Sequence, residues 1–289
     1  AHRAALDAGD TGLFLDPFYA TYPGTIRGAG ALAQPVPCAP EAGFMPRAAD
    51  IAKAAQAASR PRSLLINTPN NPTGVVYDRE TLEGIARACR DHGLWLISDE
   101  VYEGQVWAGR HLSPRALPHM SERTLVIGSM SKSHAMTGSR VGWIVGPAPV
   151  IEHLINLATH TTYGVPGYIQ EAAAFALALG PAFEDEISAP FRRRREIGAR
   201  LIAGQSIVGL VPSGGAMYLM LDIRRTGLSA TEFAQSLLDH EEIAVMPGES
   251  FGRAAQGHLR VAMTVDDAAF EAALSRLLAH AAQVKERAA

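Results

Sequence analysis

The sequence lacks the features typical of disulfide-rich, membrane-spanning or secreted proteins. Its 289 residues include only two cysteines, Cys38 and Cys89, and these form no CxxC pair. Two thiols cannot build a disulfide framework, so we expect buried thiols in a reducing cytoplasm. No apolar run reaches the ~18 residues of a membrane helix, and no secretory signal precedes the first predicted strand. We therefore expect a cytoplasmic chain without a membrane partner.

Charge of one sign is not in excess either. The 26 basic and 29 acidic residues give a formal net charge of −3, so no basic surface for nucleic acid is predicted. The ten histidines show no metal-ligand spacing such as His-Glu-x-x-His, and no metal site is predicted. Hydrophobic residues make up 47% of the chain, which is typical of a globular protein that buries its core without staples.

The first half alternates short apolar runs with helical stretches. Strands are predicted at residues 13–15, 63–67, 94–98, 124–128 and 141–146. A helix is predicted over residues 78–92, with Asp78 as its N-cap and Gly93 as its stop signal. Apolar runs that alternate with helices are typical of strands buried on both faces. The pattern predicts an α/β fold with a mostly parallel sheet and helices on both faces.

The second half has a different pattern. A long charged helix is predicted near residues 182–203, followed by short strands at 217–221, 243–246 and 259–262 and by helices near 229–240 and 266–285. This order predicts a smaller α/β domain after a connecting helix. We expect a large domain over residues 1–180, and the connecting helix with a small C-terminal domain over residues 181–289.

Polar residues follow three strands of the predicted sheet, where ligands of open parallel sheets bind. They are Asn71, Asp99, Tyr102, Ser129, Lys132 and Arg140. Taken singly, each has an ordinary explanation as a turn, a cap or a surface residue. Together they match one ligand. A lysine amine forms an imine with an aldehyde, and an aspartate keeps a pyridine nitrogen protonated. Asn and Tyr can hydrogen-bond a phenolic oxygen, while Ser and Arg can bind a phosphate. That ligand is pyridoxal 5′-phosphate.

The motifs resemble those of a known family. Residues 68–74 (TPNNPTG), 98–102 (SDEVY) and 129–143 (SMSKSHAMTGSRVGW) resemble, in order and spacing, the class I/II aminotransferases of fold-type I, which depend on pyridoxal phosphate. The resemblance extends to residues 245–248 (VMPG) and 258–261 (HLRV) and covers essentially the whole chain. It implies a homodimeric aminotransferase that exchanges an amino group between an L-amino acid and a 2-oxo acid.

The resemblance also implies the catalytic residues. Lys132 would carry the Schiff base and move the proton between the substrate Cα and the cofactor C4′. Asp99 would pair with the pyridinium nitrogen and keep the ring an electron sink. Asn71 and Tyr102 would contact the 3′-oxygen of the cofactor.

The remaining site residues are implied in the same way. Ser129 and Arg140 would bind the cofactor phosphate. Arg260, together with Asn71, would bind the α-carboxylate of the substrate. Tyr19 would stack on the cofactor ring, and a register error of one would give this role to Phe18.

The chain departs from the family at its start. Family members have a segment before the position that matches Ala1. It carries an arm over the active site and a loop whose backbone amides cradle the phosphate. The chain resembles an aminotransferase that lacks this segment, and weaker cofactor retention is expected for it. Tyr163 is expected to pack against the protein rather than to reach the site.

Other functions use the same motifs. A C–S β-lyase or a decarboxylase differs only in which bond at Cα is aligned with the π-system of the cofactor. Residues 135–140 (AMTGSR) resemble the aminotransferases more than these enzymes. An inactive truncated chain and a ligand-sensing module are the non-catalytic alternatives, and no DNA-binding segment supports the second.

Overall fold

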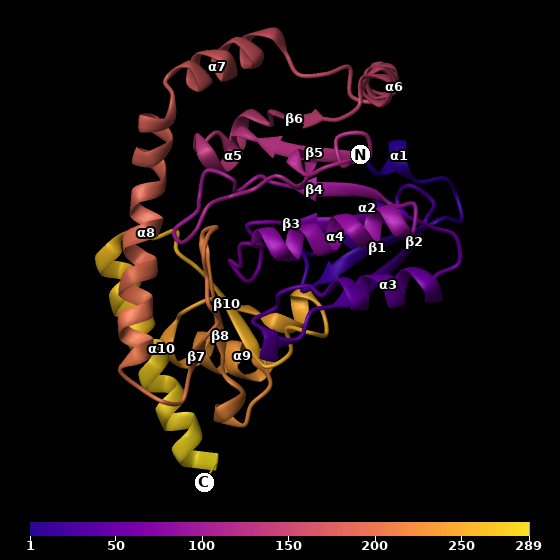
Figure 1. Ribbon diagram of the computed structural model, residues 1–289. Coiled ribbons are helices and arrows are strands. Elements are labelled where there is room, and N and C mark those ends of the chain that lie inside the picture. The colour runs from indigo at the N-terminus through magenta and orange to yellow at the C-terminus, as the bar shows by residue number, and fades with distance from the viewer. Residues whose placement is uncertain (289) are drawn as a thin grey trace.

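The computed structural model describes residues 1–288, whose strands form two separate sheets (Figure 1). The larger sheet has the strand order β2-β1-β3-β4-β5-β6 and the smaller one the order β7-β8-β10-β9. The strands of the larger sheet are β1 (Thr11–Asp16), β2 (Leu32–Pro37), β3 (Pro61–Asn67), β4 (Trp95–Asp99), β5 (Thr124–Ser129) and β6 (Gly142–Val145). Those of the smaller sheet are β7 (Gly209–Leu210), β8 (Tyr218–Asp222), β9 (Met246–Pro247) and β10 (His258–Ala262).

Helices surround both sheets. The α-helices are α1 (His2–Ala5), α2 (Tyr22–Arg27), α3 (Ala48–Ala57), α4 (Arg79–Asp91), α5 (Met130–Ser133), α6 (Ala148–Thr159), α7 (Gly167–Ala178), α8 (Pro181–Ala203), α9 (Ala230–Glu241) and α10 (Asp267–Ala288). Short 3₁₀ turns lie at Pro40–Ala42, Pro114–Ala116, Thr137–Ser139, Arg224–Thr226 and Gly248–Phe251. Within the described part of the chain, no helix is long and apolar enough to cross a membrane.

The larger sheet is mostly parallel, as predicted. Neighbouring strands from β2 to β5 pair in parallel, and only β6 runs antiparallel to β5. Side chains alternate between its two faces, because successive residues of a strand point to opposite sides. Leu64 and Ile66 of β3 join the core cluster that includes α3 and α4. Leu65 joins the cluster on the other face, which includes α2.

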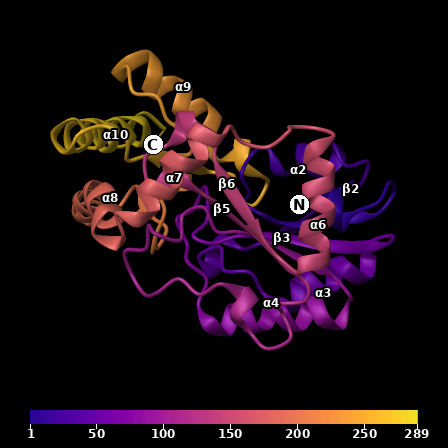
Figure 2. The same cartoon turned by 90° about the horizontal axis from the view of Figure 1, so that it is seen from above.

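Both faces of this sheet therefore carry helices. Figure 2 shows α3 and α4 on one side of β3, and α2 on the other. The side chain of Asp78 caps α4 by accepting from the backbone N–H of Thr81 at 2.8 Å. Leu82, Ile85 and Cys89 are the buried face of this helix. The predicted cap, helix and α/β class are confirmed.

The smaller sheet is antiparallel and has its own core. β10 pairs with β8 and β9, and β7 pairs with β8. Phe233 of α9 and Phe270 of α10 are buried together with Leu219 and Leu221 of β8. The long helix α8 runs along the side of the molecule from the level of α7 down to this sheet (Figure 1). The domain boundary at residue 180 stays a prediction.

Three local expectations differ from the structure. Strand β2 was not expected, because Pro35 and Pro37 interrupt it; proline is tolerated there because β2 is an edge strand. The strand predicted at residues 243–246 is wrong in its bounds, since only Met246–Pro247 pairs with β10. The packing role expected for Tyr163 is also wrong within this chain, because its side chain is 90% exposed.

Candidate active site

The carboxyl ends of β3, β4 and β5 meet at one edge of the larger sheet. The register pairs Asn67 with Asp99 and Asp99 with Ile127, so the residues that follow these strands come together. They surround a cavity of about 290 Å³. Its lining residues are Tyr19, Tyr22, Asn67, Asn71, Asp99, Val101, Tyr102, Ser129, Ser131, Lys132, Thr137, Arg140 and Tyr218. Every site residue expected from the sequence lies in this lining except Arg260, which reaches it through Asn71.

Asp99 is a partly buried carboxylate at the end of β4. Its Oδ2 accepts from the Tyr22 hydroxyl at 2.6 Å and its Oδ1 from the Val101 N–H at 3.3 Å. No ion pair joins it to any residue between 1 and 288. Burial raises the pKa of Asp99, while the two hydrogen bonds lower it. A positively charged group bound in the cavity would pair with this carboxylate.

The turn after β3 places Asn71. Its backbone N–H donates to Asn67 Oδ1 at 2.7 Å, which anchors the turn to the strand end. The turn ends at Gly74 with φ +72°, where a Cβ atom would collide with the Ser213 side chain and come within 2.9 Å of the Gly215 carbonyl oxygen. Only glycine fits both the positive φ and this close approach. The side chain of Asn71 is thereby held beside the cavity.

Lys132 lies in α5, directly after β5. Ser129 caps this short helix, and its Oγ accepts from the Ser131 N–H at 3.1 Å. Arg140 is exposed, and its backbone has a left-handed conformation with φ +54°. Its Nη1 donates to the Thr137 carbonyl at 2.8 Å. The amine, one hydroxyl and the guanidinium therefore line one cavity, and the last two are groups that bind phosphate.

Arg260 projects from β10 toward the same cavity. Its Nη1 donates to Asn71 Oδ1 at 2.9 Å. The guanidinium carbon lies 4.3 Å from the ring centre of Tyr218 and 4.5 Å from that of Phe251. Its Nε is buried and, within residues 1–288, has no hydrogen-bond partner. Such an unused donor on a sandwiched guanidinium fits a carboxylate ligand.

The surroundings of Tyr19 and Phe18 distinguish which of the two can stack on a ligand. Tyr19 lines the cavity and is partly exposed. Phe18 instead packs edge-on against Phe14, with ring centres 4.8 Å apart. The geometry therefore favours Tyr19 over Phe18 for a ring stacked on a ligand. Tyr102 is buried, and its hydroxyl lies 3.1 Å from the hydroxyl of Tyr218.

Sequence reasoning missed six lining residues, and the side chains of three of them, Tyr22, Tyr218 and Asn67, hydrogen-bond to expected site residues. Tyr22 is the first residue of α2, three residues after Tyr19, and nothing local indicates that it meets Asp99. Tyr218 is the second residue of the strand predicted at 217–221, where a buried aromatic residue is ordinary. Asn67 ends β3, and its Nδ2 donates to the Asp99 carbonyl at 2.9 Å. Its place at a strand end was the one available signal.

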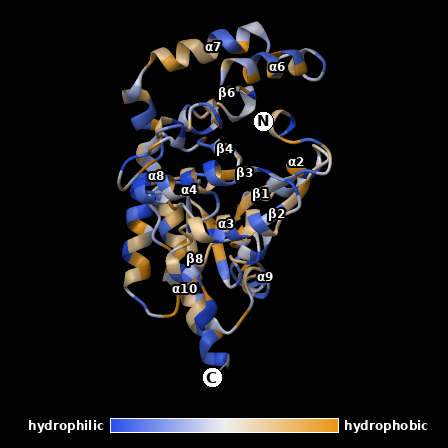
Figure 3. Ribbon diagram, turned by 45° about the vertical axis from the view of Figure 1, so that its right-hand side comes forward, coloured by the Kyte–Doolittle hydropathy of each residue, from blue (hydrophilic) through white to orange (hydrophobic). Residues whose placement is uncertain are grey.

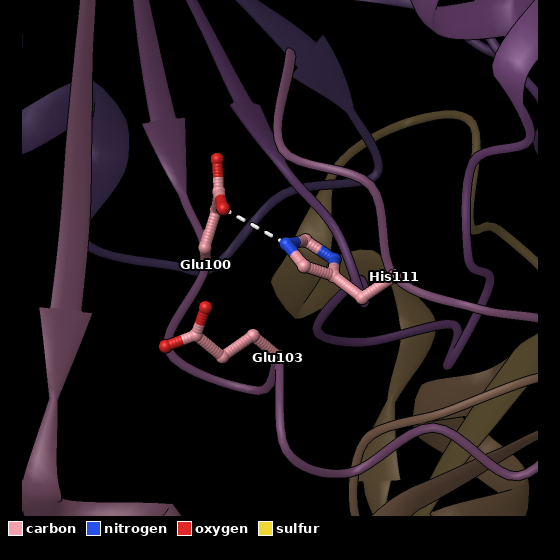
Figure 4. Close-up of side chains that lie close together, drawn as sticks. All are labelled: Glu100, Glu103 and His111. Carbon is pink, nitrogen blue, oxygen red and sulfur yellow. Dashed lines mark hydrogen bonds and ion pairs between the residues drawn. The ribbon is translucent and has the colours of Figure 1, made fainter. Parts of the chain in front are cut away.

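A second polar cluster lies on the loop beyond Asp99. Figure 4 shows Glu100, Glu103 and His111, with a hydrogen bond of 2.8 Å between Glu100 Oε2 and His111 Nε2. The Ser113 hydroxyl donates to the other Glu100 oxygen at 2.8 Å. Burial, and then the charge of Glu100, raise the pKa of Glu103. Both oxygens of Glu100 are bonded, so the cluster fastens the loop between β4 and the 3₁₀ turn at Pro114–Ala116.

Comparison with known proteins agrees with this geometry. The family described as aminotransferase class I and II matches residues 1–277. The arginine–pyruvate transaminase AruH of Pseudomonas aeruginosa is 40% identical over 98% of this chain and 71% of its own length. The aspartate/prephenate aminotransferase of Thermus thermophilus is 35% identical over 95% of this chain and 70% of its own length.

Solved structures agree with the fold. An aromatic aminotransferase from Pyrococcus horikoshii superposes with a TM-score of 0.92 at 32% identity, over 99% of this chain and 76% of that one. A double mutant of the Thermus thermophilus aspartate aminotransferase superposes with a TM-score of 0.88 at 33% identity, over 98% and 72%. Members of this family use pyridoxal phosphate. The motifs, the cavity and the relatives together make this chain a member of the class I and II aminotransferases, the transaminases of fold-type I.

Proposed function

We propose that this chain binds pyridoxal 5′-phosphate in the cavity at the strand ends and uses it to exchange an amino group between an L-amino acid and a 2-oxo acid. When bound, this cofactor supplies an aldehyde carbon for amine exchange and a ring that takes up the electron pair left at the substrate Cα. The observation that carries the proposal is the placement of Lys132 and the partly buried carboxylate of Asp99 in one cavity.

Each polar group of the cavity matches one part of that cofactor. Asp99 would pair with the protonated ring nitrogen, a cation that favours the charged form of its partly buried carboxylate. Asn71 Oδ1 already accepts from Arg260, which only donates, so the Asn71 amide nitrogen is left to donate to the 3′-oxygen. Tyr102 would be the second donor to this oxygen. Lys132 would move the proton at the substrate Cα.

The ends of the cofactor and substrate would be held by the remaining residues. Ser129 and Arg140 would bind the phosphate, and Tyr19 would stack on the ring. Arg260 would hold the substrate α-carboxylate through its free Nε and a second nitrogen, a two-pronged contact. This contact is common to all α-amino acids. Because one relative is named arginine–pyruvate transaminase, arginine and pyruvate are the first donor and acceptor to test.

Trapping of the cofactor tests the site directly. The protein is incubated with pyridoxal phosphate, reduced with borohydride and digested, and the peptide masses are measured by mass spectrometry. We expect the cofactor adduct on the peptide that contains Lys132. Lys132→Ala should lose both the adduct and the visible absorbance. Lys53→Ala, an exposed lysine of α3 outside the cavity, is the matched control and should retain both. An adduct on another lysine would refute the site.

An amino acid panel tests the reaction. Transamination converts the bound cofactor to its amine form and releases a 2-oxo acid without ammonia. β-Elimination would release pyruvate and ammonia together, and this result would assign the chain to the lyases instead. Loss of carbon dioxide would assign it to the decarboxylases. No change in absorbance with any amino acid would contradict all three activities.

The chain is also proposed to form a homodimer through α6 and α7. Figure 3 shows hydrophobic segments on both helices, which lie at the end of the molecule away from the smaller sheet. The large exposed hydrophobic residues there include Ile155 (61% exposed), Tyr163, Tyr168 (77%) and Phe175 (69%). Such a patch marks an interaction surface rather than a solvated one.

Light scattering after size exclusion tests the dimer. The wild type should elute at twice the chain mass, and Phe175→Glu should shift it toward the monomer. Leu238→Glu on α9, also an exposed hydrophobic position, is the control and should leave the mass unchanged. A monomeric wild type would refute the dimer.

The state of the two cysteines supports the proposal of a cytoplasmic location. Cys38 and Cys89 are both free and buried, and burial raises the pKa of each thiol to about 12. Free thiols are typical of reducing compartments. Cell fractionation should find the protein with cytoplasmic markers, and recovery with periplasmic or secreted proteins would contradict this.

A further inference from the structure

Tyr218 touches both halves of the candidate site. It belongs to β8 of the smaller sheet, and its hydroxyl lies 3.1 Å from that of Tyr102, on the loop after β4 of the larger sheet. Its ring lies under the guanidinium of Arg260, 4.3 Å from the guanidinium carbon. Tyr218 thus contacts both Tyr102, a proposed donor to the cofactor, and Arg260, the proposed group that binds the carboxylate.

The sheet register explains the contact with Arg260. β10 runs antiparallel to β8, and Arg260 pairs with Met220 while Tyr218 pairs with Ala262. Tyr218 is therefore the diagonal neighbour of Arg260 on the same face, within reach for a long side chain and a ring. Phe251 covers the other side of the guanidinium at 4.5 Å. The two rings hold the plane of the guanidinium by cation–π attraction.

The contact with Tyr102 decides the direction of one proton. A phenol has a single O–H to donate but can also accept. Both hydroxyls are buried, and Tyr218 is the hydrogen-bond partner of the Tyr102 hydroxyl in residues 1–288. If Tyr102 donated to Tyr218, it would have no proton left for the cofactor oxygen. If Tyr218 donates, the proton of Tyr102 is free to point into the cavity.

We propose that Tyr218 is a positioning residue for transamination, acting through Tyr102 and Arg260. Its hydroxyl donates to Tyr102 and aims the Tyr102 proton at the 3′-oxygen of the cofactor, and its ring holds Arg260 for the substrate carboxylate. The proposal rests on the proposed function, because it needs the cofactor in this cavity. It assigns the hydroxyl and the ring of one residue to two separable tasks.

The hydroxyl is tested by the absorbance of the bound cofactor as a function of pH. The absorbance transition reports the loss of the proton at the Lys132 nitrogen. After this loss the negative charge of the 3′-oxygen is less compensated, so a hydrogen-bond donor to this oxygen stabilises the deprotonated form. Such a donor therefore lowers the pH at the midpoint of the transition. Tyr218→Phe should raise this midpoint by roughly 0.1–0.3 pH unit, because a phenol oxygen that accepts a hydrogen bond makes its own O–H a stronger donor by about 10–30%. Tyr102→Phe should raise it at least as much. The double variant should match Tyr102→Phe alone, because Tyr218 acts only through Tyr102.

The ring is tested by the KM for the amino acid. Tyr218→Phe retains the ring, so KM should stay within about twofold. Tyr218→Leu removes the ring, and KM should rise roughly 2- to 30-fold. Tyr77→Phe, a buried tyrosine of the same protein outside the cavity lining, is the matched control. It should change neither the midpoint nor KM.

The outcomes separate this proposal from the proposed function. If the wild type shows no pH-dependent absorbance, or if Lys132→Ala retains it, both fail. If the wild type titrates normally but Tyr218→Phe has the wild-type midpoint, the positioning role alone fails. A larger shift in Tyr218→Phe than in Tyr102→Phe, or additive shifts in the double variant, would make Tyr218 a direct donor and overturn its action through Tyr102. An unchanged KM in Tyr218→Leu would overturn the role of the ring.

Discussion

Asp99→Asn should make the cofactor-free protein more stable at neutral pH while removing its chemistry. The carboxylate of Asp99 is partly buried, and its partners are the Tyr22 hydroxyl and the Val101 N–H. An asparagine has nearly the same shape. Its amide oxygen can accept from Val101, and its amide nitrogen can donate to the Tyr22 oxygen, because a hydroxyl both donates and accepts. The substitution therefore removes a partly buried charge, and the Tyr22 O–H, which loses its acceptor, lines the cavity and can donate to water there.

The sign of the effect follows from the pKa of Asp99. Burial raises this pKa above its ordinary value of 3.8. The folded state therefore prefers the protonated carboxyl, and this contribution to stability is present below pH 3.8 and lost as the pH rises through the raised pKa. Asp99→Asn is neutral at every pH and therefore does not lose this contribution to stability. We expect a gain of roughly 1 kcal/mol near pH 7, as for other relieved active-site residues. This corresponds to roughly 2–4 °C in melting temperature for a chain of this size.

Thermal melts of cofactor-free protein at several pH values measure this effect. The difference between variant and wild type should be largest near neutral pH and shrink toward pH 4. A variant that is less stable at pH 7, or a difference that does not change with pH, would refute the argument. Saturating pyridoxal phosphate should reverse the order. A ligand at 100 times its Kd adds about 2.7 kcal/mol, and the variant, which cannot pair with the ring nitrogen, should gain less.

Three further substitutions test neighbouring contacts. Tyr22→Phe removes the 2.6 Å hydrogen bond to Asp99, so the pKa of Asp99 should rise further. The affinity for pyridoxal phosphate near pH 8 should fall roughly tenfold in an absorbance titration; unchanged affinity would contradict the role of this bond. Arg260→Lys should raise the KM for amino acids by roughly 10–100-fold, because an ammonium cannot make a two-pronged contact with a carboxylate. An unaltered KM would place the carboxylate elsewhere. Gly74→Ala should lower the free energy of unfolding by roughly 1–3 kcal/mol in urea, since its φ of +72° and its contact with Ser213 leave no room for a Cβ. Wild-type stability would disprove the constraint.

The elements of the fold that could be predicted are those that the local sequence determines. The apolar run at residues 63–67 became β3, and the N-cap at Asp78 became the start of α4. Strand β2 was missed because its prolines break the local pattern, and only its place at the sheet edge makes them acceptable. The bounds of β9 were also predicted incorrectly, because pairing with β10 decides which two residues form this strand.

The sequence by itself determined the family of this protein and the groups that can do its chemistry. Asn71, Asp99 and Lys132 follow three successive parallel strands, and parallel strands end at one edge. This placement needed only the order of strands and the motifs after them. The tertiary structure decided which partners those groups have.

The decisive contacts join residues far apart in the chain. Tyr22 meets Asp99 across 77 positions, Tyr102 meets Tyr218 across 116, and Asn71 meets Arg260 across 189. No periodicity or spacing encodes such pairs. They depend on how α2 packs on the larger sheet and on where the smaller sheet docks, which packing of the whole chain sets. The identity of the reacting groups was thus local, whereas their charge, orientation and proton sharing come from the fold.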